Sequence, residues 1–282
     1  MKMYKQKIGI SLSNRMSVPA IDMLETVARV GFDAVSPAWD AKVDVDAIIN
    51  KAKKCGLTVQ SLHASFGQVN RLWSADEKAY AYQQNEILAA IDTCVKHAIP
   101  ILVCHVWIGW GNEIDLADAC YTAFDNLVSA ATKKGIKLAF ENTEGEQYLE
   151  ALMERYKNSD TVGFCWDSGH EQCYAPGADL LQKYGDRLLI THLNDNLGCQ
   201  SFEGNTTSND DLHLLPYDGI ADWDYNVRRL KKAKPLEILN FELLNVSKHG
   251  RHENDVYTKM SLEEYFTTAY MRACKIAYNY SK

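Results

Sequence analysis

Residues 133–142 read Lys-Lys-Gly-Ile-Lys-Leu-Ala-Phe-Glu-Asn, and this stretch contains the repeating unit from which the fold is predicted. The two lysines complement the partial negative charge at the C-terminal end of a helix, and Gly135 can take the left-handed conformation that ends one. The apolar run after Gly135 is typical of a buried strand in a parallel sheet. This run ends on the carboxylate of Glu141, so the stretch predicts a helix, a turn and a strand with a polar end.

The same order of helix, glycine and strand recurs along the chain. Gly31, Gly56 and Gly185 each follow a segment with helical periodicity and precede an apolar run, as Gly135 does. We expect strands at residues 7–13, 33–39, 57–64, 99–107, 136–142, 162–167, 188–194 and 236–243. We expect helices at residues 20–30, 45–55, 76–97, 116–134, 147–156, 178–184, 224–232 and 262–280.

Eight strands that alternate with eight helices predict an α/β protein with a closed (β/α)₈ TIM barrel. The 282 residues match the roughly 250 that one such barrel requires, so residues 1–282 are expected to form a single domain. A doubly wound open sheet is the alternative, but the Gly-x-Gly-x-x-Gly motif that favours it does not follow the first strand.

The composition argues against several classes of protein. A formal net charge of −7 argues against a general nucleic-acid-binding surface, which carries a basic excess. No apolar run approaches the roughly 18 residues of a membrane span, and the short run after the first lysines is interpreted as a strand and not as a signal peptide. The eight cysteines form no Cys-x-x-Cys pair. They resemble buried hydrophobic residues of a reducing compartment, which predicts a cytoplasmic protein.

Polar residues interrupt the predicted strands at their C-terminal ends, and the loop after the seventh strand adds two more. In a (β/α)₈ barrel these ends meet at one face, which carries the active site. The set comprises two glutamates, two aspartates and five histidines: His63, His105, Glu141, Asp167, His170, His192, Asp211, His213 and Glu242. Carboxylates crowded at one mouth repel one another, and a divalent cation removes that conflict. The pattern therefore predicts a metal site.

Each of these residues also has a structural interpretation. A single histidine at a strand end is more often a hydrogen-bonded partner than a ligand, and Asp167 can cap the helix that follows it. The aromatic side chains after the strand ends, among them Trp107, either pack the loops or form apolar walls for a polyol. The joint occurrence of polar residues at six of the eight strand ends favours the metal site.

Five stretches of the sequence resemble the xylose-isomerase-like barrel superfamily. This superfamily contains sugar isomerases and epimerases, inosose dehydratases and metal-dependent abasic-site endonucleases. The stretches are residues 140–142 (Phe-Glu-Asn), 167–170 (Asp-Ser-Gly-His), 192–195 (His-Leu-Asn-Asp), 211–223 and 241–242 (Phe-Glu). The resemblance covers nearly the whole chain.

Ketose 3-epimerase-like members hold one metal with Glu, Asp, His and Glu, which correspond here to Glu141, Asp167, His192 and Glu242. The resemblance implies that the two glutamates are also catalytic and move protons at the substrate carbon. Carboxylates with an imidazole suit Mn²⁺ as the cofactor, with Zn²⁺, Co²⁺ or Mg²⁺ as alternatives. The side chains expected to contact substrate are His63, His105, Trp107, His170, Asp211 and His213. Those epimerases carry an arginine shortly after the metal histidine, and residues 194–198 contain none.

The predicted function is a metal-dependent isomerase or epimerase of a small sugar or polyol, which abstracts a proton next to a carbonyl. A keto-polyol dehydratase of the inosose type shares that first step. We expect a small-molecule partner, no membrane and no nucleic acid, and leave homo-oligomer formation open.

Two rival functions come from other classes. The abasic-site endonucleases hold three zinc ions with nine ligands, and all nine residue types occur in this chain. Against that function, Gly169 stands where the endonuclease pattern has a cysteine, and the early loops lack a cluster of Arg and Lys for a duplex. A non-catalytic sugar-binding barrel is the other rival.

Residues 196–223 form one long irregular stretch rich in Gly, Asn, Ser, Thr and Asp. A loop of this length in a compact domain is usually functional or mobile. We expect it to carry Asp211 and His213 to the barrel mouth, within reach of Glu141 and Glu242. The alternative is a surface excursion in which His213 only bonds to a neighbour.

Overall fold

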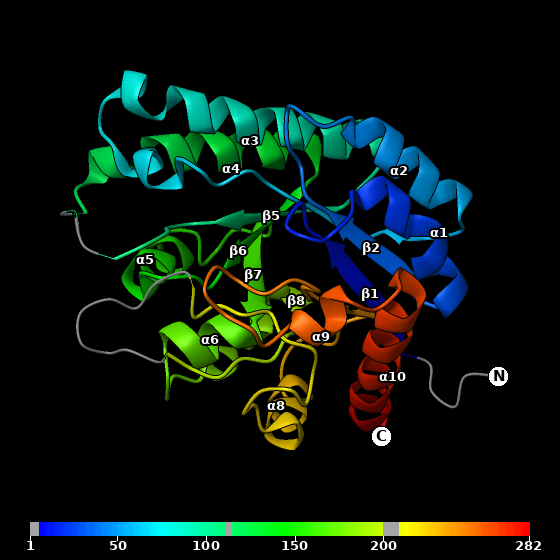
Figure 1. Ribbon diagram of the computed structural model, residues 1–282. Helices are drawn as coiled ribbons and strands as arrows, with labels where there is room; N and C mark the ends of the chain where they lie inside the picture. Colours follow the sequence, from blue (N-terminus) through cyan, green and yellow to red (C-terminus); the bar gives the residue numbers. More distant parts are fainter. Residues whose placement is uncertain (1–5, 111–113, 115, 200–208) are drawn as a thin grey trace.

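The computed structural model describes residues 6–110, 114, 116–199 and 209–282, along which strands alternate with helices (Figure 1). The strands are β1 (Lys7–Leu12), β2 (Ala34–Pro37), β3 (Thr58–Val59), β4 (Ser61–His63), β5 (Ile101–His105), β6 (Lys137–Glu141), β7 (Val162–Asp167), β8 (Leu188–His192) and β9 (Ile238–Phe241). The α-helices are α1 (Ala20–Val30), α2 (Val45–Lys54), α3 (Glu77–His97), α4 (Thr122–Lys134), α5 (Glu146–Arg155), α6 (Ser168–Tyr174), α7 (Leu180–Tyr184), α8 (Trp223–Leu230), α9 (Asp255–Thr258) and α10 (Leu262–Ser281). Short 3₁₀ helices span Val69–Trp73, Asp118–Tyr121 and Gly185–Arg187.

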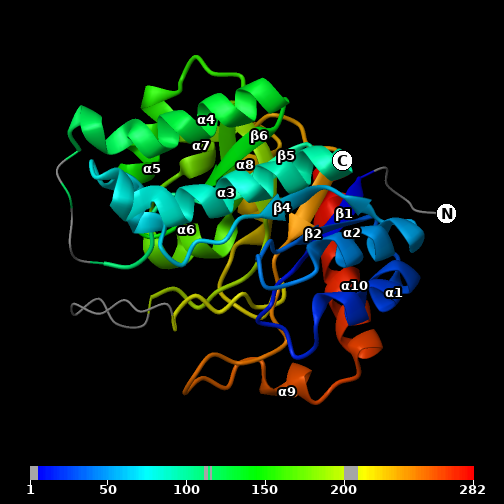
Figure 2. The same ribbon diagram turned by 90° about the horizontal axis from the view of Figure 1, so that it is seen from above.

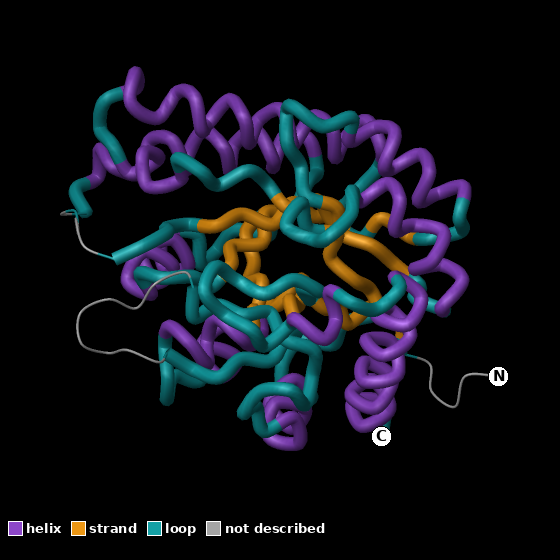
Figure 3. Tube along the Cα trace, in the orientation of Figure 1, coloured by secondary structure: helices purple, strands orange, loops and turns teal. Residues whose placement is uncertain are grey.

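The strands gather at the centre of the molecule with the helices around them (Figure 3). One parallel sheet has the order β3-β2-β1-β9, and the other has the order β4-β5-β6-β7-β8. Two seams join the sheets. Beyond β2, the Trp39 N–H donates to the His63 carbonyl at 2.8 Å, and beyond β8, Leu193 pairs with Phe241. The expected (β/α)₈ barrel is therefore confirmed.

One predicted strand, residues 57–64, is divided at Gln60 into β3 and β4. Its first part pairs with β2 and its second part with β5. The Gln60 N–H still donates to the Val35 carbonyl at 3.0 Å, so the chain passes from one sheet to the other within the barrel wall. The nine strand segments found in the described part of the chain thus fill the eight expected barrel positions.

Local signals predicted several helix ends. Gly31 (φ 116°) and Gly135 (φ 70°) end α1 and α4 in the left-handed conformation. At the start of α10, Ser261 forms a capping box. Gly185 differs from its prediction, because it is right-handed (φ −58°) and begins a 3₁₀ turn. Close packing favours a glycine there, since an added Cβ would lie 3.0 Å from the Cβ of Ala233.

The barrel interior has an apolar half and a polar half. The apolar half is a buried cluster on β5 to β8, formed by Val103, Ala139, Cys165 and Ile190. On the other half, the Asn240 amide donates to Ser11 Oγ at 2.9 Å, and Ser36 Oγ donates to Asn240 Oδ1 at 3.3 Å. Because these bonds satisfy buried polar groups, the interior is a packed floor beneath the strand ends and not a pore.

The segments that follow the strands gather on one side of this floor. Figure 2 shows the segment after β1 and the segment around α9 projecting on the same side of the barrel. Within the described residues, no helix combines the length and the apolar character that crossing a membrane requires. Cys55, Cys94, Cys104, Cys165 and Cys173 are free thiols.

Candidate active site

Four side chains meet at the C-terminal ends of neighbouring strands, and we call them the quartet: Glu141, Asp167, His192 and Glu242. The first three are the last residues of β6, β7 and β8, and Glu242 directly follows β9. His192 Nδ1 lies 3.0 Å from Glu141 Oε1 and 2.8 Å from Glu242 Oε2. One ligand atom from each of the four residues lies within 4.8 Å of the other three, so the strand register alone assembles the predicted metal ligands.

The electrostatics of the quartet suit a divalent cation. Burial raises the pKa of Glu141, but the charges of His192 and His105 outweigh it and hold that pKa well below its usual value. Burial raises the pKa of Asp167 to about 6, despite the nearby His170. Three carboxylates are thus buried around one imidazole, and their ion-pair partners within the described part of the chain are histidines. A divalent cation that shares these ligands would neutralise most of this charge.

Hydrogen bonds fix Asp167 from several sides. The Asn194 amide donates to both carboxylate oxygens, at 3.0 and 2.9 Å, and the His170 N–H donates to Oδ1 at 2.7 Å. The last bond caps α6, a helix that the sequence did not predict, so Asp167 serves as both cap and candidate ligand. Gly169 is required by this arrangement, because an added Cβ would lie 1.8 Å from Asn194 Oδ1. The cysteine of the endonuclease pattern therefore does not fit at this position.

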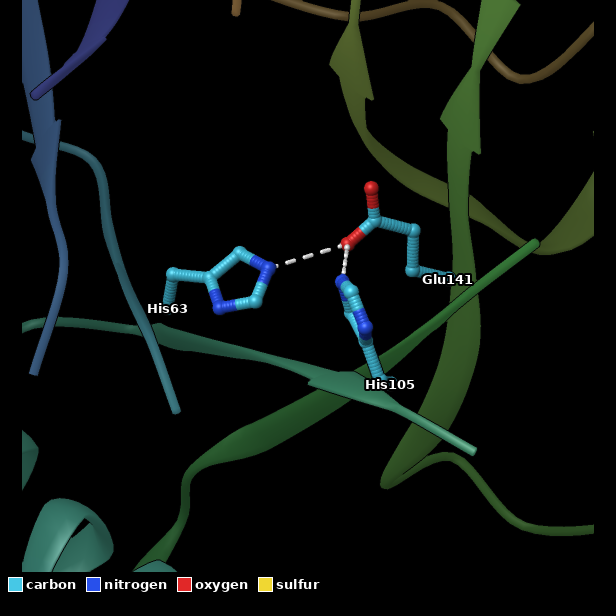
Figure 4. Close-up of side chains that lie close together, drawn as sticks. All are labelled: His63, His105 and Glu141. Carbon is cyan, nitrogen blue, oxygen red and sulfur yellow. Dashed lines mark hydrogen bonds and ion pairs between the residues drawn. The ribbon is translucent and has the colours of Figure 1, made fainter. Parts of the chain in front are cut away.

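A second group of candidate ligands adjoins the quartet through the same glutamate (Figure 4). Glu141 Oε2 lies 3.1 Å from His63 Nε2 and 3.4 Å from His105 Nε2. Burial lowers the pKa of His105 to about 4, although Glu141 opposes this shift. The ring of Phe66 stacks on His105 with 4.1 Å between centroids, so a hydrophobic face covers this imidazole.

The long loop after β8 brings a third group to the barrel mouth, as expected, and we call it the loop cluster: His170, Asp211 and His213. His213 Nε2 lies 2.8 Å from Asp211 Oδ2, and His170 Nε2 lies 3.4 Å from Asp211 Oδ1. His213 Nδ1 lies 3.2 Å from the Glu242 carbonyl, which ties the cluster to the quartet. Residues 200–208 of the predicted loop lie outside the described residues.

A cavity of about 900 Å³ opens above these groups. Five of the six predicted substrate-contacting residues line it: His63, His105, His170, Asp211 and His213. Trp107 is not among the lining residues, and its contact with substrate stays a prediction. Beyond the end of β5 the chain turns the Trp107 ring onto Tyr148, with centroids 4.0 Å apart. Gly145 makes room for the ring, because a Cβ there would lie 2.7 Å from Trp107 Cδ1.

Several cavity residues were missed by the sequence analysis, notably Arg15, Glu144, Tyr174 and Lys248. Arg15 follows β1. Polar residues were considered after later strands only, and the same criterion applied to the first strand would have identified Arg15. Lys248 comes six residues after Glu242 within an irregular segment, and no local signal marks it.

Known proteins resemble this chain along most of its length. The family of xylose isomerase-like TIM barrels matches residues 24–259. The chain is 27% identical over 293 residues to the uncharacterized protein y4fM of Sinorhizobium fredii (strain NBRC 101917 / NGR234), a match that covers 89% of this chain and 90% of that protein.

Three solved structures illustrate the likeness of the fold. The IOLI protein with a binding zinc atom has a TM-score of 0.75 at 20% identity, over 98% of this chain and 99% of that one. An L-ribulose 3-epimerase has a TM-score of 0.70 at 14% identity, over 97% and 95% of the two chains. The D-psicose 3-epimerase of Clostridium cellulolyticum H10, solved with D-tagatose, has a TM-score of 0.69 at 13% identity, over 96% and 99%. At these identities the likeness concerns the fold.

Proposed function

Because this chain belongs to the xylose isomerase-like TIM barrel family, we propose that it is a metal-dependent isomerase or epimerase of a small sugar or polyol. The observation that carries this proposal is the quartet, in which three carboxylates and one imidazole are buried next to a large cavity. Solved epimerases of the same fold act on ketoses, as the names L-ribulose 3-epimerase and D-psicose 3-epimerase state. Carbohydrate isomerisation at a carbonyl fits both the fold and the residues.

The proposed metal ligands are Glu141, Asp167, His192 and Glu242. We propose Mn²⁺ as the ion, with Zn²⁺, Co²⁺ and Mg²⁺ to be compared with it, and zinc is the ion named for the IOLI protein. A divalent cation held there would supply Lewis-acid stabilisation of the negative charge that develops on a substrate oxygen.

The proton transfers are assigned to the two glutamates. Glu242 lines the cavity, and the pKa of its carboxyl is held below its usual value by His192 despite burial. Glu141 has a lowered pKa as well, so both side chains are carboxylates that can accept a proton. In the proposed reaction one glutamate removes a proton from the carbon next to the carbonyl. A proton returned to the opposite face of that carbon completes an epimerisation, and one returned to the neighbouring carbon completes an isomerisation.

Other cavity residues are proposed to orient the substrate. The imidazoles of His63, His105 and His170 can hydrogen-bond to hydroxyl oxygens. Phe66 lines the same wall and offers an aromatic face to the C–H side of a sugar.

The experiment that tests this proposal follows hydrogen exchange. The metal-loaded protein is incubated in D₂O with a panel of ketoses, aldoses and keto-polyols, and deuterium incorporation is read by NMR. We expect deuterium at the carbon next to the carbonyl of at least one compound, and loss of that signal in Glu242→Gln with its metal content verified. Exchange that persists unchanged in Glu242→Gln would refute the assigned mechanism.

A zinc phosphodiesterase acting at abasic DNA is the second candidate. The observation that favours it is the assembly of all nine candidate ligands into three groups at one mouth. Gly169, which leaves no room for a cysteine side chain, opposes it. Three bound zinc ions together with nicking of abasic DNA would establish this function in place of the first, and absence of both activities in a metal-loaded protein would favour a binding barrel.

A further inference from the structure

The loop cluster contains a positive charge of its own. Lys248 Nζ lies 3.2 Å from Asp211 Oδ2, the same oxygen that lies 2.8 Å from His213 Nε2. The Lys248 side chain is only 12% exposed, so its ammonium group is held inside the cavity wall and does not extend into solvent. A second cation, Arg15, approaches from the loop after β1, with Nη2 3.4 Å from His213 Nε2.

The loop cluster and the quartet differ in formal charge. The quartet offers three carboxylates and one imidazole, a formal charge of −3 that a divalent cation reduces. The loop cluster offers one carboxylate and two imidazoles, and the ammonium of Lys248 already balances that carboxylate. A divalent cation added to the loop cluster would therefore lie in a buried place beside the ammonium of Lys248, a like charge.

We propose that Lys248 is the resident cation of the loop cluster and excludes a metal ion from it. The nine residues that match the ligands of the endonuclease pattern would then bind fewer than the three ions of that pattern. This inference goes beyond the proposed function, because it concerns the number of ions that the chain holds and not the sugar on which it acts.

The geometry around Asp211 supports the same assignment. A metal ion that used Asp211 Oδ2 and His213 Nε2, which face each other at 2.8 Å, would have to displace the ammonium that contacts that oxygen. Lys248 lies on the segment between β9 and α9, where the Ser247 hydroxyl donates to Asp255 Oδ1 at 2.6 Å and accepts from the Asn254 N–H at 3.0 Å. The lysine is thus carried by a backbone that is itself anchored.

Counting of bound zinc tests the proposal. The full-length protein is stripped with a chelator, titrated with zinc chloride by calorimetry, desalted and analysed for zinc by elemental analysis. In Lys248→Met, which removes the charge and keeps an unbranched apolar chain, we expect one more tightly bound zinc per chain than in the wild type. Lys248→Arg keeps the cation, and Lys133→Ala removes an exposed lysine at the end of α4, so both should match the wild type.

A second variant locates the additional ion. In the Lys248→Met background, His213→Ala should remove the additional zinc, whereas in the wild-type background His213→Ala should leave the zinc count unchanged. If Lys248→Met does not fold, as judged by circular dichroism, Lys248→Gln is used in its place. An unchanged zinc count in the folded charge-removing variant overturns the proposal, and so does a wild-type zinc that His213→Ala removes.

These outcomes are independent of sugar turnover. A protein that gains a zinc in Lys248→Met but exchanges no sugar hydrogen would refute the proposed function and leave this inference standing. A protein that exchanges sugar hydrogen but gains no zinc in Lys248→Met would support the proposed function and overturn this inference.

Discussion

The quartet and the loop cluster contain the same kinds of side chain, but different parts of the fold hold them. The quartet stands on the ends of β6, β7, β8 and β9, where the register of parallel strands sets the position of each residue. Two of the three residues of the loop cluster stand on the loop after β8, where His213 adopts a left-handed backbone (φ 48°) that a non-glycine residue rarely takes. We therefore expect anchoring and charge, as well as residue type, to decide what each group binds.

The loop must be held by contacts of its own, and Asp195 supplies them. Its carboxylate accepts hydrogen bonds from the backbone N–H groups of Tyr217 and Ala221 and from the indole N–H of Trp223, at 2.9 to 3.0 Å. Gly219 lets the loop approach this closely, since an added Cβ would lie 2.2 Å from Asp195 Oδ1. The buried carboxylate of Asp195 thus holds the loop in place, as the register of the strands holds the quartet in place.

The largest expected effect comes from the quartet. Glu141→Gln and Glu242→Gln should each lower turnover by about 10³-fold or more, because each removes a proposed acid or base without changing the size of the side chain. Steady-state rates on the substrate found by hydrogen exchange, with metal content verified, provide the measurement. Glu146→Gln at the start of α5, where the half-exposed carboxylate pairs with Lys183, is the matched control and should keep its activity. Near wild-type turnover in either quartet variant would contradict the mechanism.

Loosening the loop should have a smaller effect and should leave the quartet intact. Asp195→Asn replaces one acceptor oxygen by a donor that faces backbone N–H groups, so we expect unfolding free energy to fall by roughly 2–3 kcal/mol. Urea denaturation measures this change, and Asp224→Asn at an exposed position of α8 is the control. Metal affinity of the quartet should stay within about twofold of wild type. A large loss of metal affinity in Asp195→Asn would show that the two regions are coupled.

The third prediction concerns pH and the quartet. In the metal-free protein, burial raises the pKa of Asp167 to about 6, and the pKa of His192 lies well above its usual value because Cys165 and Glu141 outweigh burial. Both groups must lose a proton before they can bind a cation, so metal affinity should fall as the pH decreases. The expected change is roughly tenfold per pH unit for each proton released. Calorimetry in buffers of different ionisation enthalpy counts those protons, and an affinity that is flat between about pH 7 and about pH 5 would contradict the prediction.

The quartet could be predicted from sequence because strands carry their own markers. An apolar run that ends in Phe140-Glu141-Asn142 locates both the strand and its polar end, and barrel geometry does the rest. The same reasoning does not extend to Trp107, because the chain leaves β5 after His105 and strand alternation no longer determines where a side chain points. Helix α6 could not be predicted, because a seven-residue helix is too short to have a clear period and its cap is itself a candidate ligand.

Lys248 could not have been predicted for a different reason. Its role depends on a contact with Asp211, which is distant in the sequence, and on two loops that no periodic pattern describes. Asp195 had a visible signal as part of His-Leu-Asn-Asp after β8, but the partners that it binds lie more than twenty residues further along the chain. Local patterns find the strand ends, whereas the contacts between loops emerge only from the fold.

The smallest expected effect separates the role of the His213 side chain from that of its backbone. His213→Ala and His213→Gly both remove the imidazole, but glycine adopts a φ of 48° without strain, so His213→Gly should be the more stable of the two by about 1 kcal/mol. If the imidazole contacts substrate, KM should rise by roughly tenfold in both variants while kcat changes little. Thermal unfolding and steady-state kinetics of the two variants distinguish substrate contact from support of the loop. If His213 only supports the loop, KM should instead follow stability, and His213→Gly should then have a KM closer to that of the wild type than His213→Ala.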